Sequence, residues 1–278
     1  SLMRRALEYA AMFDMLVIDH CEDVSLAGDG VAHEGHHAAV LGLRGLPGVA
    51  EEIIVERDVT LSGLTGSPVH IAHISARGAL DAVRSGKDRG IRVSCEVTPH
   101  HFTLTDEQLA GYDTNYKMNP PLREAADVEA MLEGLRDGSI DCIATDHAPH
   151  HYDEKLVEFD RAPFGIVGLE TAVSICLDRL VHVGHVRLSR LVELLSVNPA
   201  RVLGVPGGEL TAGVSADITV LAPDLAVRVE AAAFRSLARN TPFDGWSLRG
   251  GVAATMVGGR TVYVNETVPG ATAFDRRS

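Results

Sequence analysis

The run Ile140-Asp141-Cys142-Ile143-Ala144-Thr145, followed at once by Asp146-His147-Ala148-Pro149-His150, decides the fold of this 278-residue chain. Its first part is short, apolar and β-branched, which is typical of a buried strand. Its second part is polar and carries groups that bind metal ions or move protons. A buried strand that ends in such groups is typical of folds whose chemistry lies at the carboxyl ends of parallel strands.

Three similar runs precede it in the chain, at Met15–Asp19, Val69–Ile74 and Ile91–Val97. Helical periodicity fills stretches between these runs, at Glu51–Leu61, Ala76–Arg89 and Ala125–Arg136. Alternating strands and helices predict βα units and a parallel sheet. A doubly wound sheet usually carries a glycine-rich phosphate turn, and the sequence shows none, so the pattern favours a (β/α)8 barrel.

Four strands cannot close an eight-stranded barrel, so we expect the first half of the barrel to lie upstream of Ser1. Residues 1–205 would then form the last four βα units and the helices that follow them. Residues 206–278 contain turns and short alternating strands, and they are expected to be the C-terminal portion of a small β domain. The predicted fold class is α/β, the C-terminal half of a (β/α)8 TIM-type barrel plus a small β-sandwich appendage.

The overall composition excludes some classes of partner. A net charge of −13 argues against nucleic acid, because nucleic-acid-binding proteins concentrate Lys and Arg on one face. No apolar run approaches the roughly 20 residues that a membrane-spanning helix needs. The four cysteines are far apart and form no C-x-x-C pair, which favours a reducing, cytoplasmic location over a disulfide framework.

Two histidines and one aspartate follow three of the predicted strands. His20 ends the first strand, His73 ends the second, and Asp146 follows the fourth. Two imidazoles on adjacent strands can share one zinc ion, which binds histidine nitrogen at about 2.0–2.1 Å. The carboxylate of Asp146 can bind metal and also accept a proton. The sequence therefore predicts a metal centre at this end of the sheet.

Two other motifs are weaker. The segment His33-Glu34-Gly35-His36-His37 matches the H-E-x-x-H pattern of metalloproteases, which requires both histidines on one helical face. Because glycine interrupts it, we predict a polar loop with surface histidines instead. In Asn119-Pro120-Pro121-Leu122-Arg123, two prolines would fix the backbone that carries the Asn119 amide, a group suited to recognising a cyclic imide or ureide.

Taken together, these residues resemble dihydroorotase, a family of the amidohydrolase superfamily that acts in pyrimidine biosynthesis. The strongest match is the run from Ala144 to His150 followed by Lys155, which fits that family's C-terminal signature. The resemblance covers nearly the whole chain in order, with the spacing of the bacterial long-chain class. The supporting matches are Asp19-His20-Cys21-Glu22-Asp23, Ala72-His73-Ile74-Ser75, Val97-Thr98-Pro99-His100-His101, Asn119–Arg123, Pro163–Glu170, Asn198-Pro199-Ala200 and Ala216-Asp217-Ile218.

The resemblance implies a binuclear zinc centre in the complete protein. His20 and His73 would bind one zinc ion and Asp146 the other, and Asp146 would also be the catalytic general acid and base. The family's His-x-His pair and bridging carboxylate are absent here and are expected upstream of Ser1. The groups implied to contact substrate are one amide, one imidazole and the backbone of one turn, namely Asn119, His150 and Phe164-Gly165.

The activity implied by the resemblance is the reversible hydrolysis of dihydroorotate to N-carbamoyl-L-aspartate. A homo-oligomer is implied, with aspartate transcarbamoylase as a possible partner. Two alternatives stay open. One is a sister cyclic amidase, allantoinase or dihydropyrimidinase. The other is a non-catalytic dihydroorotase-like subunit that supports aspartate transcarbamoylase, against which the presence of all three predicted ligands argues.

Overall fold

The computed structural model describes residues 2–274, which form two compact units. The first unit contains the residues up to Gly168 together with the later segment Arg235–Pro242, and the second contains residues 169–234 and the residues from Phe243 onward. The predicted boundary between residues 205 and 206 does not coincide with this division. Helices that follow Gly168 pack within the second unit, so the assignment of residues 1–205 to one barrel stays a prediction.

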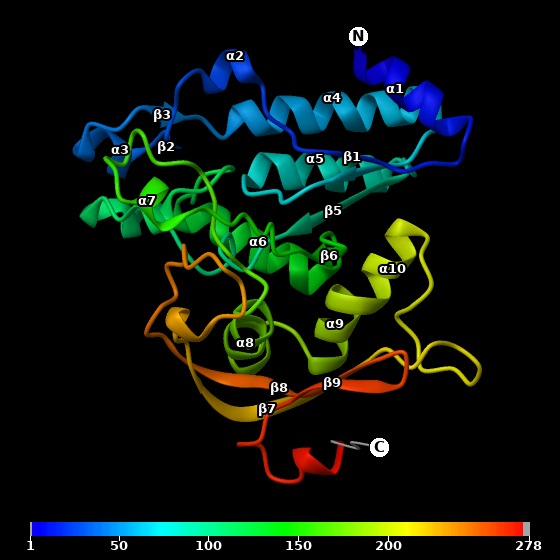
Figure 1. Cartoon of the computed structure of the whole chain (residues 1–278). Coiled ribbons are helices and arrows are strands. Elements are labelled where there is room, and N and C mark those ends of the chain that lie inside the picture. Colours follow the sequence, from blue (N-terminus) through cyan, green and yellow to red (C-terminus); the bar gives the residue numbers. More distant parts are fainter. Residues whose placement is uncertain (1, 275–278) are drawn as a thin grey trace. The chain divides into compact units, whose positions relative to one another are not determined.

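A four-stranded parallel sheet forms the centre of the first unit (Figure 1). All four predicted strands are present, and each is shorter than predicted: β1 and β5 begin two residues later, β4 ends before His73, and β6 is shorter at both ends. Their order in the sheet follows their order in the chain, and all neighbours are parallel, as βα units require. The strands are β1 (Val17–Asp19), β4 (Val69–Ile71), β5 (Val93–Val97) and β6 (Cys142–Ile143).

Helices connect the strands at the predicted places: α4 (Val49–Thr65), α5 (Arg77–Asp88) and α6 (Ala125–Asp137). Helices α4 and α5 lie side by side in Figure 1. Their close approach depends on Gly86, since a Cβ atom there would lie 2.6 Å from the side chain of Val59. One face of α5 buries Leu80 and Val83 completely, as its amphipathic sequence predicts.

Short elements complete the first unit. Strands β2 and β3 form a small parallel pair, with helix α3 between them in the sequence. Two 3₁₀ helices, Asp106–Gly111 and Thr114–Tyr116, follow β5. The remaining elements are α1 (Leu2–Ala11), α2 (Val24–Ala27), β2 (Ala32–His33), α3 (His36–Leu41), β3 (Gly45–Leu46) and α7 (Tyr152–Lys155).

The second unit packs helices on one antiparallel sheet, in the order β7-β8-β9. Gly250 in β8, at a φ of 113°, lets the strand approach the helical residue Leu177, whose Cβ would lie 2.5 Å from an added Cβ. Within residues 169–274 this is the one sheet, so a β-sandwich is not confirmed. The strands are β7 (Ile218–Arg228), β8 (Ser247–Val257) and β9 (Arg260–Val264), and the helices are α8 (Ala172–Cys176), α9 (Leu188–Val192) and α10 (Asn198–Leu203), with π-helical turns at Leu177–His182 and Glu193–Val197.

No helix within residues 2–274 has both the length and the apolar content that crossing a membrane requires.

Candidate metal centre

His20 and His73 meet at the carboxyl ends of neighbouring strands. Strands β1 and β4 pair so that Asp19 lies opposite Ile71, which places the residues just beyond them at one edge of the sheet. Nδ1 of His20 lies 3.0 Å from Nε2 of His73, and the two rings meet edge to face with centroids 4.6 Å apart. The predicted pair is therefore brought together.

This pair fits a metal ion. Two nitrogens bound to one tetrahedral zinc at about 2.0–2.1 Å lie roughly 3.3 Å apart, close to the separation seen here. The other nitrogen of His73, Nδ1, is buried without a hydrogen-bond partner. Burial, followed by the nearby His73, lowers the pKa of His20, which favours the neutral imidazole that binds metal. The separation of the two facing nitrogens and the neutral imidazole of His20 therefore suit a cation.

The backbone at two of the predicted ligands adopts an unusual conformation. His73 has a φ of 33° and Asp146 a φ of 42°, two of the four positive φ values at non-glycine residues within the described chain. Such conformations cost about 1–3 kcal/mol each and concentrate at functional sites. The strain therefore marks the same strand ends that the sequence singles out.

Asp146 lies beyond the end of β6 and is half-buried. It is close enough to His20 for its charge to raise the pKa of that imidazole, although burial has the larger, opposite effect. The ligand atoms of His20, His73 and Asp146 do not all lie within 4.8 Å of one another. The Asp146 carboxylate is therefore farther than that from at least one of the two imidazoles. This arrangement suits the predicted division, in which Asp146 binds a different ion from the histidine pair.

The side-chain amide of Asn119 lies beside the imidazole of His20. Its Nδ2 donates to Glu22 Oε2 at 2.9 Å and lies 3.5 Å from His20 Nε2, while its Oδ1 is buried with no partner. A buried amide oxygen without a partner is uncommon and calls for a ligand or an ordered water. Asn119 also lines a small pocket together with His20, Glu22 and Arg123. The Asn119 amide is thus free to accept a hydrogen bond next to the histidine pair.

A buried ion pair lines the same pocket as His20 and Asn119. Arg123 and Glu51 are 2% and 4% exposed, and Nη2 of Arg123 lies 3.2 Å from Oε2 of Glu51. Glu51 also accepts hydrogen bonds from the backbone of Ser75 and Ala76 and from the Ser75 hydroxyl. Burial alone would raise the pKa of Glu51, but Arg123 and these donors hold it below its ordinary value.

The ion pair joins the two segments that carry the candidate ligands. Ser75 lies two residues after His73, and Arg123 lies four residues after Asn119. Arg123 also donates to the carbonyl of Leu46 and to Nδ1 of His33. Arg123, predicted only as part of a motif, is therefore a structural link between the strand end and the Asn119 loop.

The H-E-x-x-H segment is not a metalloprotease helix. His33 ends strand β2, whereas helix α3 begins at His36 after the extended residue Gly35. The two outer histidines therefore do not share a helical face, which confirms the rejection. The prediction of a loop with surface histidines is wrong in two respects, because His36 and His37 lie in helix α3 and His33 is half-buried and accepts from Arg123.

His150, Phe164 and Gly165 also come together, through contacts within the protein. Nε2 of His150 lies 2.8 Å from the carbonyl oxygen of Phe164, and the backbone N–H of Gly165 donates to the carbonyl of Lys117. Gly165 has a φ of 147°, and a Cβ there would lie 2.8 Å from the Cβ of Ala148. The turn is therefore held closely against the segment that follows Asp146.

Sequence reasoning missed Asn240, which organises this turn. Its Nδ2 donates to the carbonyls of Ala148 at 2.9 Å and Gly165 at 3.0 Å, and its Oδ1 accepts from the backbone of His150 at 3.1 Å. Its side chain is almost fully buried. Asn240 lies 90 residues from His150 in an irregular segment, where no strand or helix pattern could have marked it.

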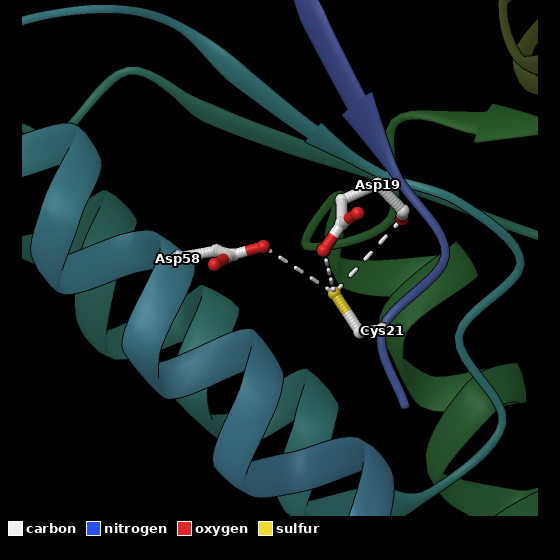
Figure 2. Close-up of side chains that lie close together, drawn as sticks. All are labelled: Asp19, Cys21 and Asp58. Atoms are coloured by element: carbon white, nitrogen blue, oxygen red, sulfur yellow. Dashed lines mark hydrogen bonds between the residues drawn. The ribbon is translucent and has the colours of Figure 1, made fainter. Parts of the chain in front are cut away.

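A second cluster of ligand-type side chains adjoins His20. Figure 2 shows the Cys21 sulfur between the carboxylates of Asp19 and Asp58, at 3.7 and 3.8 Å. Within residues 2–274 these three are the one set of His, Cys, Asp or Glu whose ligand atoms all lie within 4.8 Å. Arg57 already pairs with both carboxylates, and burial raises the pKa of the Cys21 thiol, so it keeps its proton and donates to them. The cluster is a neutralised internal network.

Burial also raises the pKa of Asp58 to about 7, against the opposing effect of its hydrogen bond from Arg57. All four cysteines are free and buried.

Two curated relatives match nearly the whole chain in sequence. The chain is 55% identical over 267 residues to a dihydroorotase from Pelotomaculum thermopropionicum, covering 96% of this chain and 62% of that protein. It is 54% identical to a dihydroorotase from Geobacter sp. strain M21, covering 94% and 61%. The chain thus spans about three fifths of the length of these relatives.

Two solved structures resemble the chain as a whole. Dihydropyrimidinase from Brevibacillus agri superposes with a TM-score of 0.85 at 22% identity, covering 98% of this chain and 62% of that one. The L-hydantoinase of Arthrobacter aurescens superposes with a TM-score of 0.85 at 27% identity, covering 94% and 60%. These likenesses show an α/β fold of the TIM-barrel type.

Residues 1–262 match the sequence profile of the Amidohydrolase family, which is generally metal-dependent. The match includes both strained strand ends, the Asn119 loop and the Phe164-Gly165 turn. The chain therefore belongs to the amidohydrolase family.

Proposed function

We propose that the complete protein is a zinc-dependent dihydroorotase, which hydrolyses dihydroorotate reversibly to N-carbamoyl-L-aspartate. The observation that carries the proposal is the His20–His73 pair, 3.0 Å apart beside the uncommitted oxygen of Asn119. The identity of 55% to a dihydroorotase supports this substrate over other cyclic amides. The conversion is a step of pyrimidine biosynthesis.

The finer fold assignment belongs to the same proposal. We infer that β1, β4, β5 and β6 are consecutive strands of the second half of a (β/α)8 barrel. Their parallel order and the share of the relatives' length that the chain covers support this inference. The first half would supply the remaining metal ligands. A cytoplasmic location, a homo-oligomer and a contact with aspartate transcarbamoylase stay predictions.

The residues of this chain would share the work of the reaction. A bound zinc ion would supply hydroxide at neutral pH, by lowering the pKa of water from 15.7 to about 7. His20 and His73 would hold one ion, and Asp146 another. Asp146 would take the proton of the attacking water and return it to the ring nitrogen as the amide C–N bond breaks. Asn119 and His150 would orient the ring.

A substrate panel tests the activity. We expect full-length protein loaded with zinc to hydrolyse dihydroorotate with a kcat/KM at least about 10³-fold above that for allantoin, dihydrouracil or hydantoin, because polar groups built for one ring reject analogues that leave them unpaired. The measurement is ring opening followed by ultraviolet absorbance. Faster turnover of dihydrouracil or hydantoin would assign the protein to a sister cyclic amidase, and turnover of none would leave the non-catalytic alternative.

Substitution of His73 tests the metal centre. In full-length protein, His73→Ala should lower the zinc content from two ions towards about one, because one imidazole alone cannot close the site that His20 and His73 share. Elemental analysis after dialysis measures this content. The matched control is His36→Ala, an exposed histidine of helix α3, which should leave it unchanged. An unaltered zinc content in His73→Ala would contradict the assignment.

A further inference from the structure

Lysine is rare in this chain and two of its lysines are buried. Of the 25 Lys and Arg residues, lysine occurs only at positions 87, 117 and 155. Lys117 is 2% exposed and Lys155 is 6% exposed. Within residues 2–274 neither ammonium forms an ion pair, although acidic side chains outnumber basic ones. Burying an ammonium group with no carboxylate in direct contact is costly, so the position calls for an explanation.

The two ammonium groups bind backbone carbonyls of two irregular segments. Lys117, in the segment 114–119, donates from Nζ to the carbonyls of Phe159 at 2.7 Å and Asp160 at 3.0 Å. Lys155 donates in the opposite direction, to the carbonyls of Thr114 at 3.1 Å and Lys117 at 3.4 Å, and also to the carbonyl of Pro163 at 2.7 Å within its own segment. Each lysine therefore crosses from one segment to the other.

Aromatic rings complete the environment of Lys117. Its Nζ lies 4.8 Å from the ring centroid of Phe164 and 5.5 Å from that of Phe159. Such contacts favour a cation, most of all where water is excluded. Burial lowers the pKa of both lysines to about 8, a value at which each is still mostly protonated at neutral pH.

The chemistry of the donors explains the choice of lysine. An ammonium carries three N–H groups on a compact head, whereas the guanidinium of arginine is a planar fork. Three carbonyls surround Lys155 Nζ, which matches its three donors. These donors are used within the protein, so Lys155 does not offer them to an anionic ligand.

The linked segments carry groups that the proposed function uses. Asn119 lies two residues after Lys117, and Phe164-Gly165 follows Pro163 directly. The backbone N–H of Gly165 also donates to the carbonyl of Lys117 at 2.9 Å. The spacing between the Asn119 amide and the Phe164-Gly165 turn therefore depends on this cross-link.

We propose that Lys117 and Lys155 are positioning residues, which hold segment 155–165 against segment 114–119 so that Asn119 and the Phe164-Gly165 turn face one small cyclic substrate together. The proposal rests on the proposed function for the identity of the substrate. The cross-link itself is a property of the fold and is measured without any substrate.

Hydrogen–deuterium exchange of the full-length protein tests the cross-link. Lys155→Met and Lys117→Met keep the side-chain length and remove the donors. Peptides that cover residues 156–165 should then exchange about tenfold faster or more, since several charge-assisted hydrogen bonds are lost. The matched control is Lys87→Met, which removes a lysine that is 27% exposed and bonds to the Ser139 carbonyl and to Asp141. It should leave those peptides unchanged.

Steady-state kinetics test the positioning role. In both variants the KM for dihydroorotate should rise about tenfold while kcat changes less than about threefold, because substrate contacts and not the proton-transferring groups are displaced. Lys155→Gln keeps two N–H donors, so its exchange rate and its KM should fall between those of Lys155→Met and the unaltered protein. It also serves as the milder variant if Lys155→Met does not fold.

Two outcomes would overturn the proposal. One is an exchange rate of residues 156–165 that does not change in any Lys117 or Lys155 variant, and the other is faster exchange that is equal in all peptides of the protein. Absence of dihydroorotate turnover in the unaltered protein would refute the proposed function instead, and the exchange result would still decide whether the lysines link the two segments.

Discussion

If the proposed function holds, full-length protein with Asp146→Asn is expected to lose about 10²–10⁴-fold in kcat for dihydroorotate, the range that a positioned general acid and base contributes. An amide has nearly the shape of the carboxylate but cannot take up a proton from the attacking water. Asn also tolerates positive φ about as well as Asp does, so the backbone at 42° should be retained. The loss should therefore fall on chemistry and not on folding.

Steady-state assays together with thermal unfolding separate these two effects. The matched control is Asp153→Asn in helix α7, whose side chain is 81% exposed and close in sequence; it should keep full activity. A kcat for Asp146→Asn within about threefold of the unaltered enzyme would remove Asp146 from the proton-transfer role. A melting temperature that falls by many degrees would show that the residue is mainly structural.

Replacing Arg123 by Met should destabilise the protein by about 3–5 kcal/mol, because the carboxylate of Glu51 would be left buried without its cation. Loss of this partner should also raise the pKa of Glu51 above its present, lowered value. In the unaltered protein, that lowered pKa contributes stability above the ordinary pKa of a glutamate, and the contribution disappears as pH falls through the folded value. In the variant the unpaired carboxylate is the costly form, so its protonation should relieve part of the destabilisation, and the difference in stability from the unaltered protein should narrow as pH falls.

Urea unfolding at neutral pH and at pH 4 measures both effects. The matched control is Arg136→Met, whose partner Glu129 is 54% exposed and whose loss should cost no more than about 1 kcal/mol. The double variant Arg123→Met with Glu51→Met should recover part of the lost stability, since it leaves no unpaired charge. Equal stability of Arg123→Met and Arg136→Met would contradict this account of the ion pair.

The strand ends could be predicted from the sequence because two signals coincide there. Apolar β-branched runs give the strand, and polar residues immediately after the run give its carboxyl end. Parallel pairing then places His20 beside His73 without any long-range information. The strained φ values of His73 and Asp146 could not be foreseen, because histidine and aspartate give no local signal for them.

Contacts that depend on tertiary packing were not predictable. Asn240 reaches His150 across 90 residues, and Glu51 pairs with Arg123 across 72. Glu51 in particular looks like an exposed first-turn residue of α4, since nothing in its helix requires a buried partner. The sandwich was predicted from alternating residues in the C-terminal part, which indicate strands but not how many sheets they form.

The positive φ values at His73 and Asp146 have an evolutionary consequence. The backbone that carries Asp146 accepts Asn, and Gly even more readily, so the carboxylate to which we assign proton transfer can be lost in one substitution without added backbone strain. Selection for a stable fold then gives the carboxylate no protection. Among descendants of such a chain, folded proteins that have become catalytically silent at this position should arise readily and persist wherever another role maintains them.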